Sequence, residues 1–406
     1  MKKLLILGAS PYEIAVVNKA RSKGIYTIVT DQYVDLTVSP AKLVADEAWN
    51  ISWSDIDALE QKCKEVGVDG VVAGYSEFRV ENLIKLTSRL QLPCYCNIEQ
   101  LETTRDKILF KEACRRYGVP VVPQYNPNDE LDDSLFPVIV KPVDRGGSIG
   151  ITVAYNQEEY KRSKEYALSL SPSKNIIVEK FMRDYQKMDL YYIVVDGKYY
   201  CFGSSDTVMN QNVEGIEIAQ REWLYNSVFE KQYIQTVDPA VKSMMAGLNF
   251  QHGYITYSAF AKGEEIFFFE TGYRFSGEQS FRFCEKRLGF DYLDVMISEA
   301  LSLPEKYAVG QLKENIYSKV INFHATRSGK ISRIIGVEEL SKITGVDDIL
   351  LIHKDGEQME LKSGAFPYVA MITISSDNKE DLDELSARIK TNFDVLDENG
   401  KSMILH

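Results

Sequence analysis

The stretch Val140-Lys-Pro-Val-Asp-Arg-Gly-Gly-Ser-Ile-Gly150 is the most specific feature of this 406-residue sequence. An apolar run before it predicts a buried strand that ends at Lys141. The residues Gly146, Gly147 and Ser148 free backbone amides to point at phosphate oxygens, and Ser148 adds a hydroxyl group. The stretch is not a P-loop, because the pattern GxxxxGK[ST] is absent. Taken alone, it fits a phosphate-binding loop and a glycine-rich surface hairpin equally well.

Upstream of this stretch, strand-like and helix-like segments alternate. Short apolar strands are expected at 4–10, 26–30 and 70–74, with helical periodicity between them and again at 80–90. Such alternation implies a parallel, doubly wound sheet, and this first unit ends near residue 100. Its first turn, Gly8-Ala-Ser-Pro-Tyr12, has one of the three glycines of a dinucleotide fingerprint. That favours a tight turn or a small-substrate contact over a nicotinamide or flavin site.

Downstream, the pattern mixes helices with antiparallel strands. Asp196-Gly197 separates two strand-like runs, as in a hairpin with a type I′ turn, and a second long hairpin is expected over 254–270. After residue 305 the pattern returns to strands, followed by a helix over 379–391. The sequence therefore predicts three domains. The first is 1–100; the second is 101–305, with a lid subdomain at about 120–180; the third is 306–406, a small α+β domain.

Composition excludes several classes of protein. The chain has 47 Lys and Arg against 59 Asp and Glu, a net charge of -12, which argues against nucleic-acid or membrane-surface partners. Six scattered cysteines and four histidines form no zinc pattern and no disulfide framework, so a cytoplasmic location is expected. We expect neither a signal peptide nor a membrane span, because no apolar run is long enough.

A second chemical motif ends the hairpin at 254–270. The run Ile266-Phe-Phe-Phe-Glu270 is followed four residues later by Arg274. A carboxylate at a strand end can hold Mg²⁺ through its oxygens, and an arginine can grip an anion with two parallel hydrogen bonds. An ordinary ion pair at a strand end is the alternative interpretation.

In their order and spacing these pieces resemble the ATP-grasp superfamily of carboxylate–amine or carboxylate–thiol ligases and carboxylases. The resemblance covers residues 1 to about 300 and, more loosely, the remainder, which is similar to the closing domain of L-amino-acid ligases and biotin-carboxylase-like enzymes. It implies a mixed α/β and α+β fold: a Rossmann-like preceding domain, an ATP-grasp domain of two α+β subdomains, and a C-terminal α+β domain. Carbamoyl-phosphate synthases share this organisation.

The resemblance also implies which residues bind ATP. A helix-entry lysine and the strand lysine would neutralise phosphates, the glycine-rich loop would close as a lid, a hinge segment would contact the adenine, and an acid would face the ribose. In this sequence those positions are Lys107, Lys141, Gly146, Gly147, Ser148, Gly150, Glu179, Lys180, Phe181, Met182 and Asp189.

The same resemblance implies the chemistry. A substrate carboxylate would attack the γ-phosphorus of ATP to give an acyl phosphate and ADP, and an amine or thiol would then displace phosphate. Arg274 and Lys141 would be the catalytic residues, with Mg²⁺, or Mn²⁺ in its place, held by Glu270. The partners implied are ATP, a small carboxylate and a small amine, and homodimers are common in the family.

The sequence departs from the family at the metal site. The family has an acid on the strand before the hairpin and an asparagine two residues after the glutamate. Here Ser258 and Gly272 take those positions, and Glu278 is a candidate substitute. A non-catalytic ATP-binding homologue with a degenerate metal site is therefore the alternative to an active ligase. A Rossmann oxidoreductase is a third hypothesis, against which the lone Gly8 argues.

Substrate-binding residues are less clearly indicated. Gly74-Tyr-Ser-Glu-Phe-Arg79 lies where the family's first domain often contacts the carboxylate substrate, but Ser76 as a helix N-cap and Glu77 as its first-turn acid explain the segment slightly better. Arg221 and Lys231 are further candidates for anion binding, and solvated charges are the simpler explanation of both.

Overall fold

The N-terminal unit is a parallel sheet covered by helices. A computed structural model describes residues 1–144, 149–209, 220–304, 307, 309–361 and 367–405. Its first sheet has the strand order β3-β2-β1-β4, with β1 paired in parallel to both β2 and β4. The elements of this unit are β1 (Lys3–Leu7), α1 (Glu13–Ser22), β2 (Tyr26–Thr30), η1 (Pro40–Leu43), β3 (Glu47–Trp49), α2 (Ile56–Val66), β4 (Gly70–Val72) and α3 (Glu77–Leu90).

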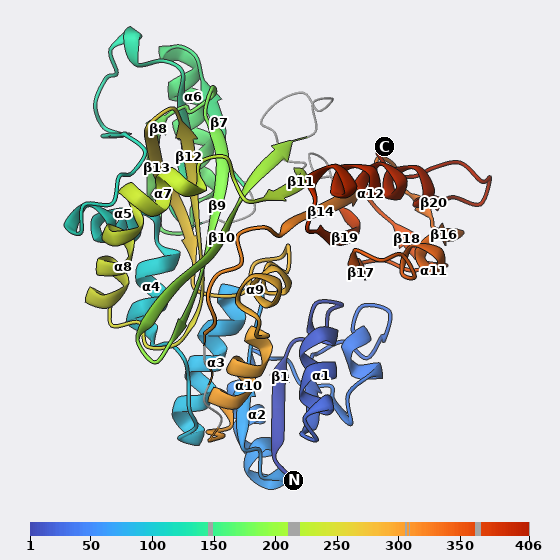
Figure 1. Ribbon diagram of the computed structural model, residues 1–406. Helices are drawn as coiled ribbons and strands as arrows, with labels where there is room; N and C mark the ends of the chain where they lie inside the picture. The colour runs from blue at the N-terminus through green and yellow to red at the C-terminus, as the bar shows by residue number, and fades with distance from the viewer. Residues whose placement is uncertain (145–148, 210–219, 305–306, 308, 362–366, 406) are drawn as a thin grey trace.

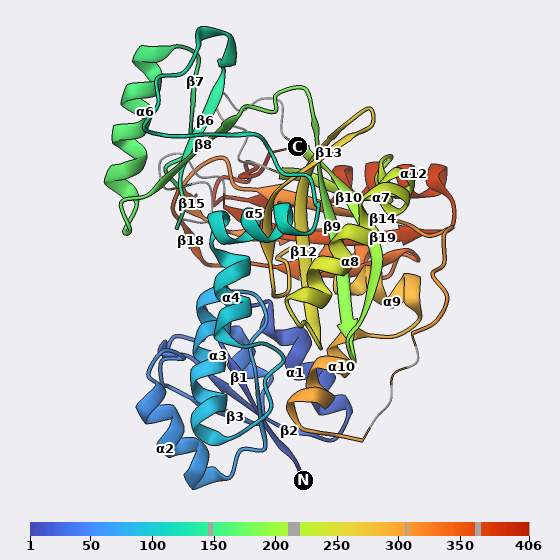
Figure 2. The same ribbon diagram turned by 90° about the vertical axis from the view of Figure 1, so that its left-hand side faces the viewer.

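Two short helices lead out of this unit, α4 (Ile98–Arg105) and α5 (Lys107–Arg116). Asn97 caps α4 in a reciprocal capping box with Gln100. The Asp106 carboxylate then accepts hydrogen bonds from the backbone N–H groups of Ile108 and Leu109, which fixes the start of α5 at Lys107. This second cap places Lys107 in the first turn of α5, where the chain enters the next unit (Figure 2).

A four-stranded antiparallel sheet follows, in the order β5-β8-β6-β7, and it stands apart from the rest of the molecule with α6 on one side (Figure 1). Its elements are β5 (Gln124–Tyr125), η2 (Asp133–Leu135), β6 (Val138–Pro142), β7 (Thr152–Ala154), α6 (Gln157–Leu170) and β8 (Ile176–Lys180). A small core of its own holds this sheet together; it includes Val138, Val140, Tyr160 and Val178.

The largest sheet has eight strands in the order β13-β12-β9-β10-β11-β14-β19-β17 and forms the centre of the molecule (Figure 1). Its antiparallel hairpins include the two expected from the sequence, one turning at Asp196-Gly197. The strands are β9 (Gln186–Val195), β10 (Lys198–Met209), β11 (Gln220–Tyr225), β12 (Gly253–Lys262), β13 (Glu265–Gly272), β14 (Tyr317–His324), β17 (Val346–Leu351) and β19 (Tyr368–Ser376).

Because β11 pairs with β14, this sheet runs through the boundary expected near residue 305. The three-domain division stays a proposal.

The remaining elements are α7 (Glu230–Thr236), α8 (Asp238–Gly247), α9 (Phe281–Leu288), α10 (Tyr292–Ala300), β15 (Gly329–Lys330), β16 (Arg333–Ile335), α11 (Val337–Leu340), β18 (Gln358–Met359), α12 (Lys379–Asn392) and β20 (Asp394–Leu396).

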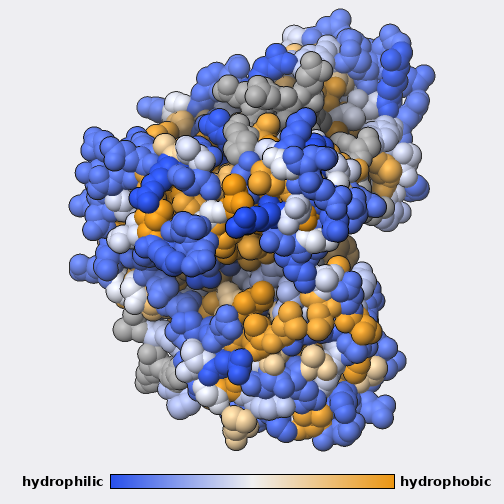
Figure 3. All heavy atoms as spheres, turned by 90° about the vertical axis from the view of Figure 1, so that its right-hand side faces the viewer, coloured by the Kyte–Doolittle hydropathy of each residue, from blue (hydrophilic) through white to orange (hydrophobic). Residues whose placement is uncertain are grey.

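The hydrophobic core joins the N-terminal unit to the large sheet. One cluster of buried side chains contains residues of β1 and α1 together with residues of β9, β12 and α10. On the face drawn in Figure 3, hydrophobic side chains gather along the middle and on the lower half, which the N-terminal unit occupies. Within the described residues, no helix combines the length and apolar character needed to cross a lipid bilayer.

Candidate functional site

Three buried charged side chains form the centre of the candidate site. The Glu179 carboxylate of β8 makes an ion pair with Lys141 of β6, at 2.7 Å, and a second ion pair with Lys111 of α5. The side chains of Lys111, Glu179 and Lys141 are 0%, 2% and 7% exposed. We call these three residues the buried triad. They join the four-stranded sheet that contains β6 and β8 to helix α5.

The buried triad places two lysine side chains around one carboxylate. Burial lowers the pKa of Lys141 to about 8. The negative charge of Glu270 raises this pKa, and the positive charge of Lys107 lowers it further. Burial also lowers the pKa of Lys111 to about 6, and the nearby charge of Lys141 adds to that effect. A single carboxylate balances one ammonium group, so a second buried ammonium is unfavourable. An incoming polyanion would restore that balance.

A row of polar side chains crosses the large sheet nearby. In the strand register, Asp189 of β9 lies opposite Ser258 of β12, and Ser258 lies opposite Glu270 of β13. The Ser258 hydroxyl donates to Asp189 Oδ1 at 2.5 Å, and the Thr207 hydroxyl donates to Asp189 Oδ2 at 3.3 Å. Asp189 is 5% exposed, whereas Glu270 is exposed. The two carboxylates therefore flank Ser258 on neighbouring strands.

Glu270, Asp189 and Arg274 line a cavity of about 260 Å³. Glu278 also lines it and is 7% exposed. Burial raises the pKa of Glu278, and the nearby charge of Asp189 raises it further. Side chains from β11, β19 and the first βα turn, including Tyr12, complete the wall. Glu278 therefore lies in the same cavity as Glu270.

Arg274 is held by the N-terminal unit. Its Nε donates to Glu77 Oε1 at 2.7 Å, and its Nη1 donates to the carbonyl of Phe275 at 2.8 Å. Ser76 occupies the N-cap position of α3, as expected, but its side chain makes no capping hydrogen bond. Glu77 does lie in the first turn of α3 and also orients Arg274.

The other predicted nucleotide-binding residues lie around the small sheet. Lys107 Nζ donates to the carbonyl of Val143 at 3.5 Å, just beyond β6. Gly150 has φ +79°, and a Cβ atom there would come within 2.8 Å of Pro142, so glycine is required. Gly146, Gly147 and Ser148 lie outside the described residues.

The predicted hinge comes at the end of β8. Lys180 is exposed, and the side chain of Met182 is buried. The backbone N–H groups of Lys180 and Phe181 donate to the carbonyls of Pro123 and Pro137, which tie the hinge to both flanking segments.

The structure brings several of the residues predicted from sequence into two neighbouring groups, one around Lys141 and Glu179 and one around Glu270 and Asp189. The charges of Glu270 and Lys107 both affect the pKa of Lys141, so both side chains lie in its neighbourhood. Arg274 shares a cavity with Glu270 and Asp189 but has no described contact with the buried triad. Arg221 and Lys231 are not among the residues that line this cavity.

The sequence interpretation missed Lys111. The buried positions of α5 are Phe110, Lys111, Ala113 and Cys114, so a lysine lies on the apolar face of that helix. A charged residue at such a position needs a buried partner, so a lysine on the apolar face of a helix was the sequence feature that could have predicted this ion pair. Its partner, Glu179, lies 68 residues further along the chain, which local periodicity cannot reveal.

Metal ligands are sparse. The described part of the chain holds no group of three or more His, Cys, Asp or Glu side chains arranged to bind a metal ion. Glu270 is the single metal ligand that the sequence resemblance implied, and Mg²⁺ commonly uses one or two carboxylates together with substrate phosphates and water. The donor set therefore fits Mg²⁺ that arrives with ATP better than a resident ion.

The chain is similar in sequence to several known proteins. Residues 118–224 match the family model described as D-ala D-ala ligase C-terminus. The carbamoyl phosphate synthase large chain of Sulfurisphaera tokodaii is 24% identical over 75% of this chain, which spans 31% of that relative. A formate-dependent phosphoribosylglycinamide formyltransferase of Francisella tularensis is 24% identical over 67% of this chain and 70% of its own length.

Solved structures are similar over nearly the whole chain. The L-amino acid ligase of Bacillus licheniformis has a TM-score of 0.78 at 16% identity, covering 98% of this chain and 99% of its own. The biotin carboxylase domain of the Hydrogenobacter thermophilus 2-oxoglutarate carboxylase has a TM-score of 0.80 at 19% identity, covering 97% and 91%. These likenesses confirm the fold expected from the motifs, and residues 118–224 match the model of a ligase family.

Proposed function

We propose that this protein is an ADP-forming ligase that joins a small carboxylic acid to an amine, or to a thiol, through an acyl phosphate. The observation that carries the proposal is the buried triad, in which Lys141 shares one carboxylate with a second buried lysine. A polyanion such as ATP can draw Lys141 away from Glu179 without leaving that carboxylate unpaired, because Lys111 remains.

The proposed nucleotide site lies between the small sheet and the large one. Lys107 and Lys141 would neutralise phosphates, and the loop 146–150 would close over them. The segment 179–182 would contact the adenine, and Asp189 would face the ribose. Positioning and charge stabilisation are the main contributions of a protein to phosphoryl transfer. No nucleophilic side chain is needed.

In the first step an oxygen of the substrate carboxylate forms a bond to the γ-phosphorus, and the bond from that phosphorus to the β–γ bridging oxygen breaks, releasing ADP. Arg274 would bind the transferred phosphoryl group in the cavity that it shares with Glu270. Mg²⁺, held by Glu270 and by the phosphates, would supply charge neutralisation of the triphosphate. Closure of the lid would exclude water, which would otherwise hydrolyse the acyl phosphate.

In the second step the amine nitrogen attacks the acyl carbon, and phosphate leaves. The amine must lose a proton, and we assign its acceptance to Glu278. This carboxylate is 7% exposed and lines the same cavity as Arg274, and burial raises its pKa, which makes it a stronger base than a free glutamate.

The test is release of ADP from Mg-ATP in the presence of mixed amino acids, followed for the wild type and three variants. Lys141→Ala and Glu270→Ala are expected to lose activity by at least about a hundredfold, the range of single charge-stabilising groups. Glu264→Ala is the matched control, since Glu264 is exposed in the turn between β12 and β13. Tight ATP binding without turnover across a broad screen of acids and amines would instead support the non-catalytic homologue.

A further inference from the structure

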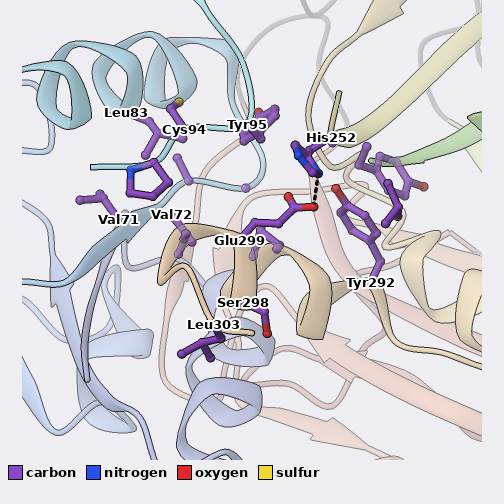
Figure 4. A pocket seen from close by; sticks show the side chains of 18 of the residues that line it. Val71, Val72, Leu83, Cys94, Tyr95, His252, Tyr292, Ser298, Glu299 and Leu303 are labelled. Carbon is purple, nitrogen blue, oxygen red and sulfur yellow. Dashed lines mark ion pairs between the residues drawn. The ribbon is translucent and has the colours of Figure 1, made fainter. Parts of the chain in front are cut away.

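A second and larger cavity, of about 560 Å³, lies between the N-terminal unit and the large sheet (Figure 4). Its walls come from the end of β4, the segment after α3, the start of β12, and α10. The volume lies in the range of small-molecule binding sites. Among the described residues, Arg274 alone lines both this cavity and the cavity of Asp189 and Glu270. The larger cavity therefore meets the cavity of Asp189 and Glu270 only at Arg274.

One part of the larger cavity is apolar. The side chains of Val71, Val72, Leu83 and Met296 line it. Strand β4 pairs with β1 on one side, and its other edge has no partner strand among the described residues. An unpaired strand edge presents backbone N–H and C=O groups that need partners. This region suits an apolar molecule that also carries a hydrogen-bonding group.

The opposite end of the larger cavity is acidic and aromatic. His252 Nδ1 lies 2.6 Å from Glu299 Oε1, and Asp196 lines the same end. The hydrogen bond to Glu299 raises the pKa of His252, and Asp196 acts in the same direction. Two carboxylate side chains therefore face one imidazole at this end of the cavity. Figure 4 shows Tyr95 and Tyr292 beside this pair.

We propose that the larger cavity binds an organic ammonium ion, with the positive group at the end lined by Glu299 and Asp196 and an apolar body against Val72 and Leu83. Carboxylates and aromatic faces both attract an ammonium group, the latter through cation–π interaction. An anionic ligand would meet two carboxylates. It would gain little from Arg274, whose guanidinium already donates to Glu77 and to a backbone carbonyl.

Cys94 offers a direct readout of occupancy. It lines the larger cavity and is partly exposed, and hydrogen bonding from Cys96 lowers the pKa of its thiol to about 7. A thiol with that pKa is readily alkylated near neutral pH. Four other cysteines, Cys63, Cys96, Cys114 and Cys284, are buried, and burial raises the pKa of the Cys201 thiol. Iodoacetamide labelling of Cys94, read by peptide mass spectrometry, would therefore report on this cavity.

The experiment compares phenethylamine, phenethyl alcohol and 3-phenylpropionate as ligands of the wild-type protein without ATP. Only the amine is expected to slow labelling of Cys94. Glu299→Gln should weaken that protection at least tenfold, and Leu83→Trp, which fills the apolar part, should abolish it. Glu285→Gln is the control, because Glu285 is exposed on α9.

Absence of protection by the amine would overturn the proposal, as would equal protection by the alcohol or the carboxylate. Because the comparison of the three ligands uses the wild-type chain, it stands even where a variant fails to fold. It also needs no nucleotide, so its failure is distinct from a failure of the proposed ligase activity.

Discussion

Glu179 is the residue on which the buried triad depends. Its carboxylate is the buried ion-pair partner of two lysine side chains that are both almost fully buried. Glu179→Ala would leave both without a counter-ion, and we expect it to lower the free energy of unfolding by about 3–5 kcal/mol. Lys111→Met should lower it by less, about 2 kcal/mol or under, because Lys141 still pairs with Glu179 and methionine fills the apolar site. Urea denaturation measures both values. Equal losses for the two variants would contradict this account.

The pKa of Lys141 predicts how nucleotide affinity changes with pH. Bound phosphates favour the charged lysine, so they raise its pKa above the value of about 8 in the free protein. Above that pH the free protein must take up a proton to bind ATP. Affinity is therefore constant below about pH 7 and falls by up to about tenfold per unit above pH 8. Isothermal titration with an ATP analogue tests this. Lys141→Arg should remove the pH dependence, since arginine stays charged.

At the scale of elements, β12 and β13 determine the metal site. Gly272 ends β13, and a Cβ atom there would come no closer than 3.5 Å to Glu77 Oε1, an ordinary contact. Gly272→Asn therefore fits and would add an oxygen ligand two residues from Glu270. The Mg²⁺ concentration that gives half-maximal ADP release should fall about tenfold. Gly277→Asn is the control, because its Cβ would meet open space. An unchanged Mg²⁺ requirement would place the metal elsewhere.

The eight-stranded sheet is the feature that makes the molecule one unit. Strand β14, beyond the proposed boundary at 305, pairs with β11, and β19 and β17 extend the same sheet. A chain ending at residue 304 would expose the whole edge of β11 and part of the core. We expect it to aggregate or to unfold without a cooperative transition. A soluble monomer of 1–304 with a sharp thermal transition would contradict this.

Much of this architecture could be predicted from sequence, because its signals are local. The alternation of strands and helices before residue 100, the Asp196-Gly197 turn and the position of Lys141 on a strand all follow from neighbouring residues. The pairing of β11 with β14 could not be predicted, since it joins strands about 95 residues apart. The Lys111–Glu179 pair and the contact of Glu77 with Arg274 escaped prediction for the same reason.

The central claim, transfer of the γ-phosphoryl group to a carboxylate, is tested most directly by following oxygen atoms. The protein is incubated with Mg-ATP, unlabelled amines and amino acids whose carboxylate oxygens are ¹⁸O, and the released phosphate is analysed by mass spectrometry. Our account predicts one ¹⁸O in each phosphate released by the coupling reaction, because the attacking oxygen leaves with phosphorus. Ligation that releases unlabelled phosphate, or AMP and pyrophosphate, would contradict it.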